Sequence, residues 1–235
     1  MMKIFSATFL LISFFANPAS ADIFDWHSTN IQLLRGWNFE LGEPSRSTVS
    51  LQHSNKWRYG DTYAFIDIDE SGDAYAEIHP RLSLGKITGK SLAVGPIADI
   101  FVASTFEFAP GANRRLFGFG FDWKIPGFSY LKTNFYTRNN PSLAGSAEQV
   151  TVSWGLPVPL GKHRLFFDGF ADITGVEGTR VANEQVQAGA LIDIGHYWGQ
   201  PNKFFIGTEY IYWNNKFGLD GVRESVFQIE LRYVL

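Results

Sequence analysis

Alternation of apolar and polar side chains runs through almost the whole chain after its first 21 residues. The last stretch, Phe227 to Leu235, shows it best, because Gln228, Glu230 and Arg232 separate its apolar residues. Successive side chains of a β-strand point to opposite faces, so a period of two predicts strands with one apolar and one polar face. About twelve such stretches follow one another, and no helical periodicity persists over several turns. The sequence therefore predicts an all-β protein.

Two architectures accommodate such strands. In a soluble β-sandwich the apolar face is the core, whereas in a closed membrane barrel it meets lipid. The polar face here combines Asp, Glu and Arg with Tyr and Phe, as expected of a wet channel wall. The features favour a transmembrane antiparallel β-barrel of about 12 strands. Outward-facing aromatic residues are expected near strand ends, as in the interfacial girdles of such barrels: Trp37, Phe39, Trp123, Trp154, Tyr210 and Tyr212.

The first 21 residues have the features of a secretory signal peptide. Lys3 supplies the positive charge, Ile4 to Ala16 the apolar stretch, and Ala19 to Ala21 a small-residue cleavage site. The apolar stretch is too short to span a bilayer as a helix. We expect a signal peptide at residues 1–21 and one outer-membrane β-barrel domain at residues 22–235.

Composition excludes several classes of protein. The chain contains no cysteine, which rules out disulfide scaffolds, cysteine-ligated zinc fingers and cysteine nucleophiles. Its formal net charge of −3 argues against binding to nucleic acid. The sequence has no GxSxG, HExxH or P-loop pattern, and its histidines and acids lack metal-ligand spacing. We therefore expect no enzymatic activity, no cofactor and no metal site.

Several short motifs, in order along the chain, resemble the Tsx-like nucleoside-specific channels of the bacterial outer membrane. They are Ala76 to Leu84 (AEIHPRLSL), Gly95-Pro96, Gly118 to Asp122 (GFGFD) and Asn134 to Arg138 (NFYTR). The resemblance implies a monomeric barrel of twelve antiparallel strands with a narrow lumen that passes nucleosides. It also implies outer-membrane lipid, the barrel-assembly machinery and periplasmic chaperones as partners.

Two positions depart from the pattern of that family. His79 stands where the family usually carries a second Glu, and Leu235 replaces the usual terminal Phe. The loops are also shorter than in the best-known members. These departures bear on substrate selectivity more than on fold.

The residues that alternate with the apolar ones form the polar phase of each strand, and they are expected to line the lumen. A nucleoside has a flat base, which aromatic faces can stack, and an uncharged ribose, whose hydroxyls carboxylates can accept. We expect Tyr63, Phe65 and Tyr136 to stack bases, and Asp67, Glu77 and Arg81 to order the ribose and its water. The full set of predicted substrate-binding residues is Tyr63, Phe65, Asp67, Tyr75, Glu77, Arg81, Asn134, Tyr136, Arg138, Phe166 and Phe170.

Other interpretations of the same residues stay open. Inward charges in a narrow barrel can simply neutralise each other, and Glu77 with Arg81 and Asp122 with Lys124 are the candidate pairs. Phenylalanines on the polar phase could instead fill a tapering barrel. The alternative function is therefore a non-conducting structural or binding barrel, and a lipid-modifying barrel enzyme is weaker still.

The barrel prediction also assigns sides. The residues expected to face lipid are Leu33, Phe119, Phe135, Val152 and Ile229. Both termini are expected in the periplasm, with periplasmic turns near 55–60, 125–127 and 157–161. The longer segments are expected mostly outside the cell, at 70–73, 110–114, 139–147, 175–183 and 214–221.

Overall fold

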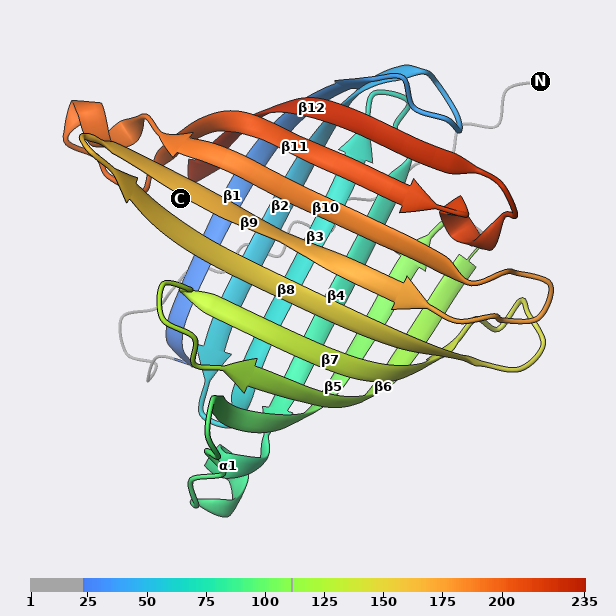
Figure 1. The fold of residues 1–235 in the computed structure, drawn as a ribbon, viewed down its shortest axis with the longest axis horizontal. Coiled ribbons are helices and arrows are strands. Elements are labelled where there is room, and N and C mark those ends of the chain that lie inside the picture. Colours follow the sequence, from blue (N-terminus) through green and yellow to red (C-terminus); the bar gives the residue numbers. More distant parts are fainter. Residues whose placement is uncertain (1–22, 111) are drawn as a thin grey trace.

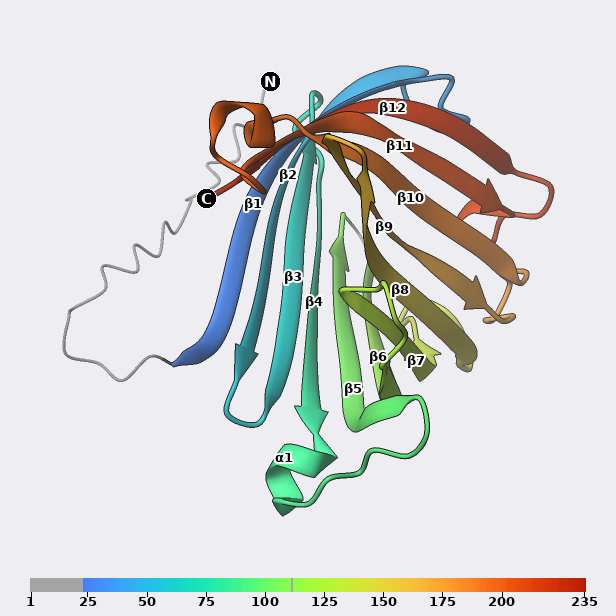
Figure 2. The same cartoon turned by 60° about the vertical axis from the view of Figure 1, so that its left-hand side comes forward.

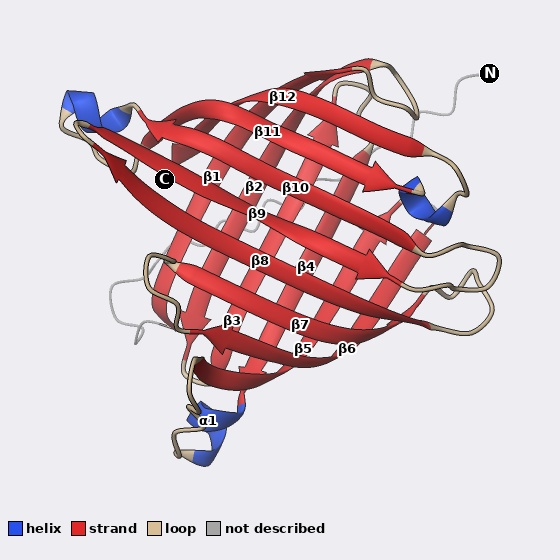
Figure 3. Ribbon diagram, in the orientation of Figure 1, coloured by secondary structure: helices blue, strands red, loops and turns tan. Residues whose placement is uncertain are grey.

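The computed structural model describes residues 23–110 and 112–235, so the expected signal peptide at residues 1–21 lies outside the described residues. Almost all of the described chain is strand (Figure 3). Among these residues no helix is long and apolar enough to cross a membrane. The elements are β1 Phe24–Trp37, β2 Ser45–Trp57, β3 Gly60–Asp69, β4 Ala74–Ser83, α1 Leu84–Thr88, β5 Ile97–Ala109, β6 Ala112–Trp123, β7 Tyr130–Asn139, β8 Ala147–Leu160, β9 His163–Thr174, β10 Asn183–Asp193, the 3-10 helix η1 Gly195–Trp198, β11 Phe204–Asn214, the 3-10 helix η2 Lys216–Gly218 and β12 Arg223–Val234.

The strands form one closed sheet. Each strand pairs antiparallel with its neighbour along the chain, and β1 pairs antiparallel with β12 (Figure 1). The closing register runs from Asn30 opposite Val234 to Gly36 opposite Gln228. Closure pairs the two outer strands along most of their length, and only the first residues of β1, Phe24 to Ser28, extend beyond the end of β12. The predicted antiparallel barrel of twelve strands is confirmed.

The apolar phase of the strands faces outward. Leu33, Phe119, Phe135 and Ile229 are each about half exposed, and Val152 shares its face with Val150, the register partner of Phe135. The opposite phase is polar and largely buried, which is the reverse of a soluble protein and the arrangement of a barrel in lipid. The five lipid-facing positions predicted from the sequence are confirmed.

The even number of strands brings both termini to one end of the barrel, which we call the terminal end; the other is the distal end. The connections expected in the periplasm, after β2, β6 and β8, all lie at the terminal end. The longest connection, residues 84–96, also lies there and contains α1 (Figure 2). The expectation that longer segments gather at the distal end therefore holds only in part.

The prediction that Phe39 belongs to the outer aromatic girdle is wrong. Asn38 has a φ of 68°, which turns the chain after β1 toward the distal mouth of the barrel. Phe39 is consequently buried against Ile211 and Val226 on the inner wall. The guanidinium of Arg46 lies 3.8 Å from its ring centroid. The side chain that was expected in the membrane interface thus narrows the mouth.

A buried ion pair stands beside Phe39 in the distal mouth. Lys216 in η2 donates to Glu224 at 2.5 Å, and the backbone N–H of Glu40 donates to the other carboxylate oxygen at 3.1 Å. Burial lowers the pKa of Lys216, and the contact with Glu224 opposes that shift. The pair ties the β1–β2 connection to β12 at the mouth.

Candidate functional site in the lumen

Every predicted substrate-binding residue lies on the inward phase of its strand. On β3 and β4 the register places Phe65 opposite Glu77 and Asp67 opposite Tyr75. The predicted residues of β7, at 134, 136 and 138, share one face of that strand, and those of β9, at 166 and 170, share one face of theirs. Alternation along a strand fixes this common side. The structure therefore brings the predicted residues onto one inner surface, although they differ in burial and partners.

A continuous aromatic surface covers the inner face of β3 and β4. We call Tyr63, Phe65, Tyr75 and His79 the aromatic wall. The Phe65 ring centroid lies 5.9 Å from those of Tyr63 and Tyr75 and 6.4 Å from that of His79, with which it is stacked at 23°. Tyr63 and His79 are 5.4 Å apart. These separations are typical of favourable aromatic pairs, so the wall is a preformed surface rather than a set of independent rings.

Glu77 is the carboxylate of the aromatic wall. Tyr75 donates its hydroxyl hydrogen bond to Glu77, and His79 Nε2 lies 3.0 Å from the other carboxylate oxygen. His79 Nδ1 lies 3.0 Å from the Thr105 hydroxyl on β5. The predicted pairing of Glu77 with Arg81 is wrong, because Arg81 points its guanidinium to other acids. Glu77 is therefore held in place by neutral or titratable neighbours.

The first of three ion-pair networks, the terminal network, joins β3, β4, β6 and β7 near the terminal end. Arg81 is 3% exposed and donates to Asp61 at 2.5 and 2.8 Å and to Asp122 at 2.8 Å. Lys132 donates to the same Asp61 at 3.2 Å. The Arg81 guanidinium also lies 4.1 Å from the Phe101 ring centroid. Because β3 and β7 are not neighbours, the Lys132–Asp61 contact crosses part of the lumen.

These contacts also overturn the predicted pair of Asp122 with Lys124. Lys124 follows the end of β6, and its backbone N–H donates to Pro96 O at 2.8 Å. Asp122 instead accepts from Arg81, two strands away. The partner of an inward charge is thus set by contacts across the inside of the barrel.

The second network, the distal network, is centred on Glu107 of β5. Arg114 donates to it at 3.0 Å, and Arg138 donates at 2.5 and 3.1 Å. Arg138 Nε lies 3.8 Å from Glu177 in the β9–β10 connection, and its Nη1 also donates to Gln149 at 2.9 Å. The predicted solute-binding residue Arg138 is therefore already surrounded by protein partners.

The third network lies on the opposite wall. Arg232 of β12 donates to Asp168 of β9 at 2.5 Å and to Glu230 at 2.7 Å. Asp168 and Arg232 are on strands separated by β10 and β11, so this contact also cuts across the inside of the barrel. Every Arg and Lys of the three networks has at least one acid partner within the protein. These cations are therefore engaged by the barrel wall itself.

Four inward carboxylates have neither such a partner nor a backbone N–H donor, and we call them the unpaired carboxylates. Within the described chain, no Lys or Arg nitrogen lies within 4 Å of any of them. Neutral side chains donate to some of them, such as Thr151 to Asp172 at 2.5 Å and Gln228 to Glu209 at 2.9 Å. Their charges act on one another across the lumen. They are Asp67 on β3, Glu77 on β4, Asp172 on β9 and Glu209 on β11. Among the described residues, the inward Asp69, Asp99 and Asp193, at strand ends, also lack a Lys or Arg partner, but backbone N–H groups donate to them.

Two predicted residues of β7 are less available than expected. Tyr136 is 2% exposed, packs with Ala103 and Leu116, and shares a hydrogen bond with Thr105 at 3.3 Å. It has no free face in this structure, because the small inward residues Gly118 and Ala103 let the ring sink into the wall. Asn134 is also buried. The expected stacking role therefore fits Phe65 and Tyr63 better than Tyr136.

The phenylalanines of β9 lie apart from the aromatic wall. Phe166 packs near Phe205 of β11, with ring centroids 6.3 Å apart. Phe170 faces Ser153 and Gln187 in the register. Both are half-buried, so they add apolar surface to the far wall of the lumen. The structure does not join them with Tyr63 and Phe65 into one stacking platform.

Sequence reasoning missed several residues that shape the site. His79 departs from the family pattern, yet it completes the aromatic wall and contacts both Glu77 and Thr105. Its position on the polar phase, two residues from Glu77, was the available signal. Asp61 and Glu107, which hold the ion-pair networks, carried no signal beyond their phase.

A closed barrel with an apolar outer face and a charged, aromatic inner wall defines a β-barrel of the bacterial outer membrane that belongs to the channel class. Comparison with known proteins gives the family. Residues 25–233 match the family of the nucleoside-specific channel-forming protein Tsx, and the chain belongs to that family.

Relatives in other bacteria agree with this assignment. Outer membrane protein OmpK of Vibrio parahaemolyticus is 23% identical over 205 residues, which cover 78% of this chain and 76% of OmpK. The nucleoside-specific channel-forming protein Tsx of Salmonella typhimurium is 24% identical over 135 residues, covering 48% of this chain and 47% of Tsx. The protein is thus an outer-membrane protein.

A solved structure supports the fold independently of sequence. The KdgM porin, solved in complex with disordered oligogalacturonate, has a TM-score of 0.53 to this chain. The match covers 87% of this chain and 98% of KdgM, at 7% identity. At that identity the likeness concerns the fold alone, and it confirms a barrel of the porin type.

Proposed function

We propose that this protein passes nucleosides across the outer membrane by facilitated diffusion. The observation that carries the proposal is the aromatic wall lying beside the unpaired carboxylates. A flat base can stack on any aromatic ring that has a free face. Because every base has such a flat face, stacking does not distinguish strongly between bases. The wall thus offers a weak site for many bases rather than a pocket for one.

The polar part of a nucleoside fits the remaining groups. Ribose hydroxyls and exocyclic amino groups donate hydrogen bonds, and the unpaired carboxylates accept them without competition from a neighbouring Lys or Arg. Arg81, Lys132, Arg114, Arg138 and Arg232 are engaged in the three networks, so these cations hold the wall rather than bind the solute. Weak sites of this kind favour conduction, because a solute must leave as readily as it enters.

The relatives support the choice of solute. Membership of the Tsx family and the name of the Salmonella relative both point to nucleosides. The proposal includes a monomeric channel that carries a signal peptide at residues 1–21, inserts through the barrel-assembly machinery after delivery by periplasmic chaperones, and has no catalytic activity.

A non-conducting barrel is the second candidate, and one observation favours it. Lys132 with Asp61 and Arg232 with Asp168 each link strands that are not neighbours. Such contacts fill part of the lumen with side chains. The two candidates differ in whether solutes cross at all.

Liposome swelling distinguishes them. Purified protein is reconstituted into liposomes, which are diluted into isosmotic uridine, adenosine or glucose, with protein-free liposomes as the control. A nucleoside channel predicts faster swelling in uridine than in glucose, although glucose is smaller. Rates ordered by size alone would contradict nucleoside preference, and no swelling in any solute would support the non-conducting barrel.

A further inference from the structure

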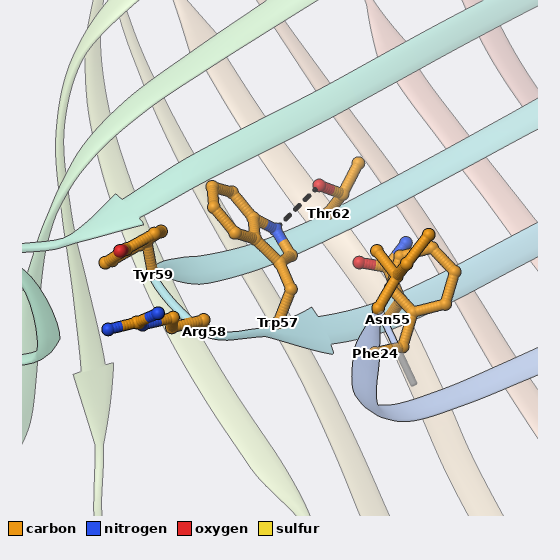
Figure 4. A pocket seen from close by; sticks show the side chains of 7 residues that line it. Phe24, Asn55, Trp57, Arg58, Tyr59 and Thr62 are labelled. Atoms are coloured by element: carbon orange, nitrogen blue, oxygen red, sulfur yellow. Dashed lines mark hydrogen bonds between the residues drawn. The ribbon is translucent and has the colours of Figure 1, made fainter. Parts of the chain in front are cut away.

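A hollow opens on the outer wall of the barrel at its terminal end. It has a volume of about 420 Å³ and lies between the start of β1 and the β2–β3 turn. Figure 4 shows Phe24 and Asn55 on one side of it, the Trp57 ring in the middle and Tyr59 on the other side. Because these side chains are on the outer face, the hollow belongs to the membrane-facing surface and not to the lumen.

The walls of the hollow are apolar and fixed. Trp57 and Tyr59 pack edge to face with centroids 6.0 Å apart. The Trp57 indole N–H donates to Thr62 at 3.3 Å, so its donor is used within the protein (Figure 4). Phe24, the register partner of Trp57, is exposed beside it. A hydrocarbon chain could lie along this surface without displacing a polar contact.

One polar atom within the hollow lacks a partner. Asn55 is 7% exposed, and its side-chain Oδ1 has no hydrogen-bond donor among the described residues. Figure 4 shows this oxygen on the side of Asn55 that faces Trp57, and both residues line the hollow. A buried acceptor without a donor is unfavourable. The site therefore fits a ligand that carries a hydrogen-bond donor as well as apolar surface.

The rim of the hollow is cationic. The Arg58 guanidinium lies 5.1 Å from the Tyr59 ring centroid, and no carboxylate of the described chain lies within 4 Å of it. Lys86 of α1 stands close by, donating to Trp57 O at 2.8 Å. A phosphate group would find a free positive charge here.

The outer wall changes character at this depth. Outward residues of β1 and β2 are polar near the terminal end, at His27, Thr29 and His53, and apolar farther along, at Leu33 and Leu51. Such a change marks the level where lipid headgroups meet hydrocarbon. The hollow lies on the headgroup side of this boundary, which suits a lipid whose chains point toward the apolar band.

We propose that the hollow binds one phospholipid with an ammonium headgroup, of the phosphatidylethanolamine class. The glycerol ends of its acyl chains lie against Trp57 and Phe24 and the chains continue toward the apolar band, its phosphate contacts Arg58, and its ammonium donates to Asn55 Oδ1. Phosphatidylcholine offers the same phosphate and chains, but its quaternary nitrogen carries no N–H. The orphan acceptor of Asn55 therefore makes the site selective between these two lipids.

Native mass spectrometry of the purified barrel in detergent tests this proposal. The probes are phosphatidylethanolamine and phosphatidylcholine with identical acyl chains, each added over a range of concentrations. The wild type should retain one phosphatidylethanolamine with about tenfold higher affinity than phosphatidylcholine, the effect of one charge-assisted hydrogen bond. Equal retention of the two lipids would overturn the proposal.

Variants separate the two contacts. Asn55→Leu should abolish the preference while phosphatidylcholine binding persists, and Asn55→Asp should increase it. Arg58→Gln should weaken both lipids equally. Lys162→Gln is the control, because Lys162 is an exposed cation in the β8–β9 turn at the same end of the barrel, without a carboxylate within 4 Å among the described residues.

The controls also decide the interpretation. Heat-modifiable migration on gels confirms that each variant is folded before lipids are compared. If Lys162→Gln weakened lipid binding as much as Arg58→Gln, only general attraction to the headgroups would remain. Persistence of the phosphatidylethanolamine preference in Asn55→Leu would likewise contradict the assigned contact.

Discussion

Replacement of Phe65 by Ala removes the central ring of the aromatic wall without adding or removing charge. Phe65 lies within 6.4 Å, centroid to centroid, of Tyr63, Tyr75 and His79. The substitution therefore opens a gap in the middle of the surface on which bases are proposed to stack. The ion-pair networks do not involve Phe65, so the barrel should remain closed.

The magnitude follows from the number of rings that remain. Stacking of a base on an aromatic side chain is worth about 1–3 kcal/mol. Because three neighbouring rings stay in place, we expect a loss near the lower part of that range, about 1.4 kcal/mol, which corresponds to about tenfold in affinity. Conductance in the absence of solute should stay the same or rise slightly, since the ring occupies volume in the lumen.

The assay is the concentration of nucleoside that halves single-channel ion current in a planar bilayer. Phe135→Ala is the matched control, because it makes the same substitution in a membrane-spanning strand at a side chain that faces lipid. It should leave nucleoside block unchanged. Block that is equally strong in wild type and Phe65→Ala, with a current otherwise intact, would refute the assignment of the aromatic wall as the binding surface.

Three further predictions concern stability, ion selectivity and topology. Asp61→Asn leaves the buried Arg81 with one acid and the half-buried Lys132 with none, and it should lower the free energy of unfolding in denaturant by about 3 kcal/mol. Asp25→Asn, at an exposed ion pair with Lys86, should cost less than about 1 kcal/mol; equal losses would contradict the network. Neutralising the unpaired carboxylates together should reduce the preference for cations over anions, measured as the reversal potential in a salt gradient, because rings of acids favour cations; an unchanged potential would show that they do not face the ion path. A cysteine at Ser71, at the distal end, should react with a membrane-impermeant thiol reagent in intact cells, and one at Lys162, at the terminal end, should not; the reverse pattern would invert the topology.

The strand pattern was predictable because the two sides of a barrel wall differ so strongly. Lipid outside and a polar lumen inside impose opposite chemistry on alternate residues, and Leu33, Phe119 and Ile229 therefore reveal the outer face directly from sequence. The same phase placed Tyr63 and Phe65 inside. The side of the wall on which a residue lies depends only on its own strand, so it can be predicted from the sequence.

Depth and partners depend on the closed barrel and were not predictable in this way. Tyr136 shares the inward phase of Asn134, but small neighbours across the register let it sink into the wall. Arg81 reaches Asp122, two strands away, because side chains converge inside a closed sheet. One error was avoidable: Glu77 and Arg81 are four residues apart on one strand, about 13 Å at the usual rise, which is too far for a close pair without bending.

The central claim, that this outer-membrane barrel is a channel with a nucleoside-binding lumen, is tested most directly by single-channel current of the wild-type protein. Uridine or adenosine added at millimolar concentration should interrupt the current reversibly, with block that grows with concentration and saturates. Glucose at the same concentration should interrupt it far less. An open channel whose current no nucleoside alters would contradict the account and leave only a generic narrow barrel.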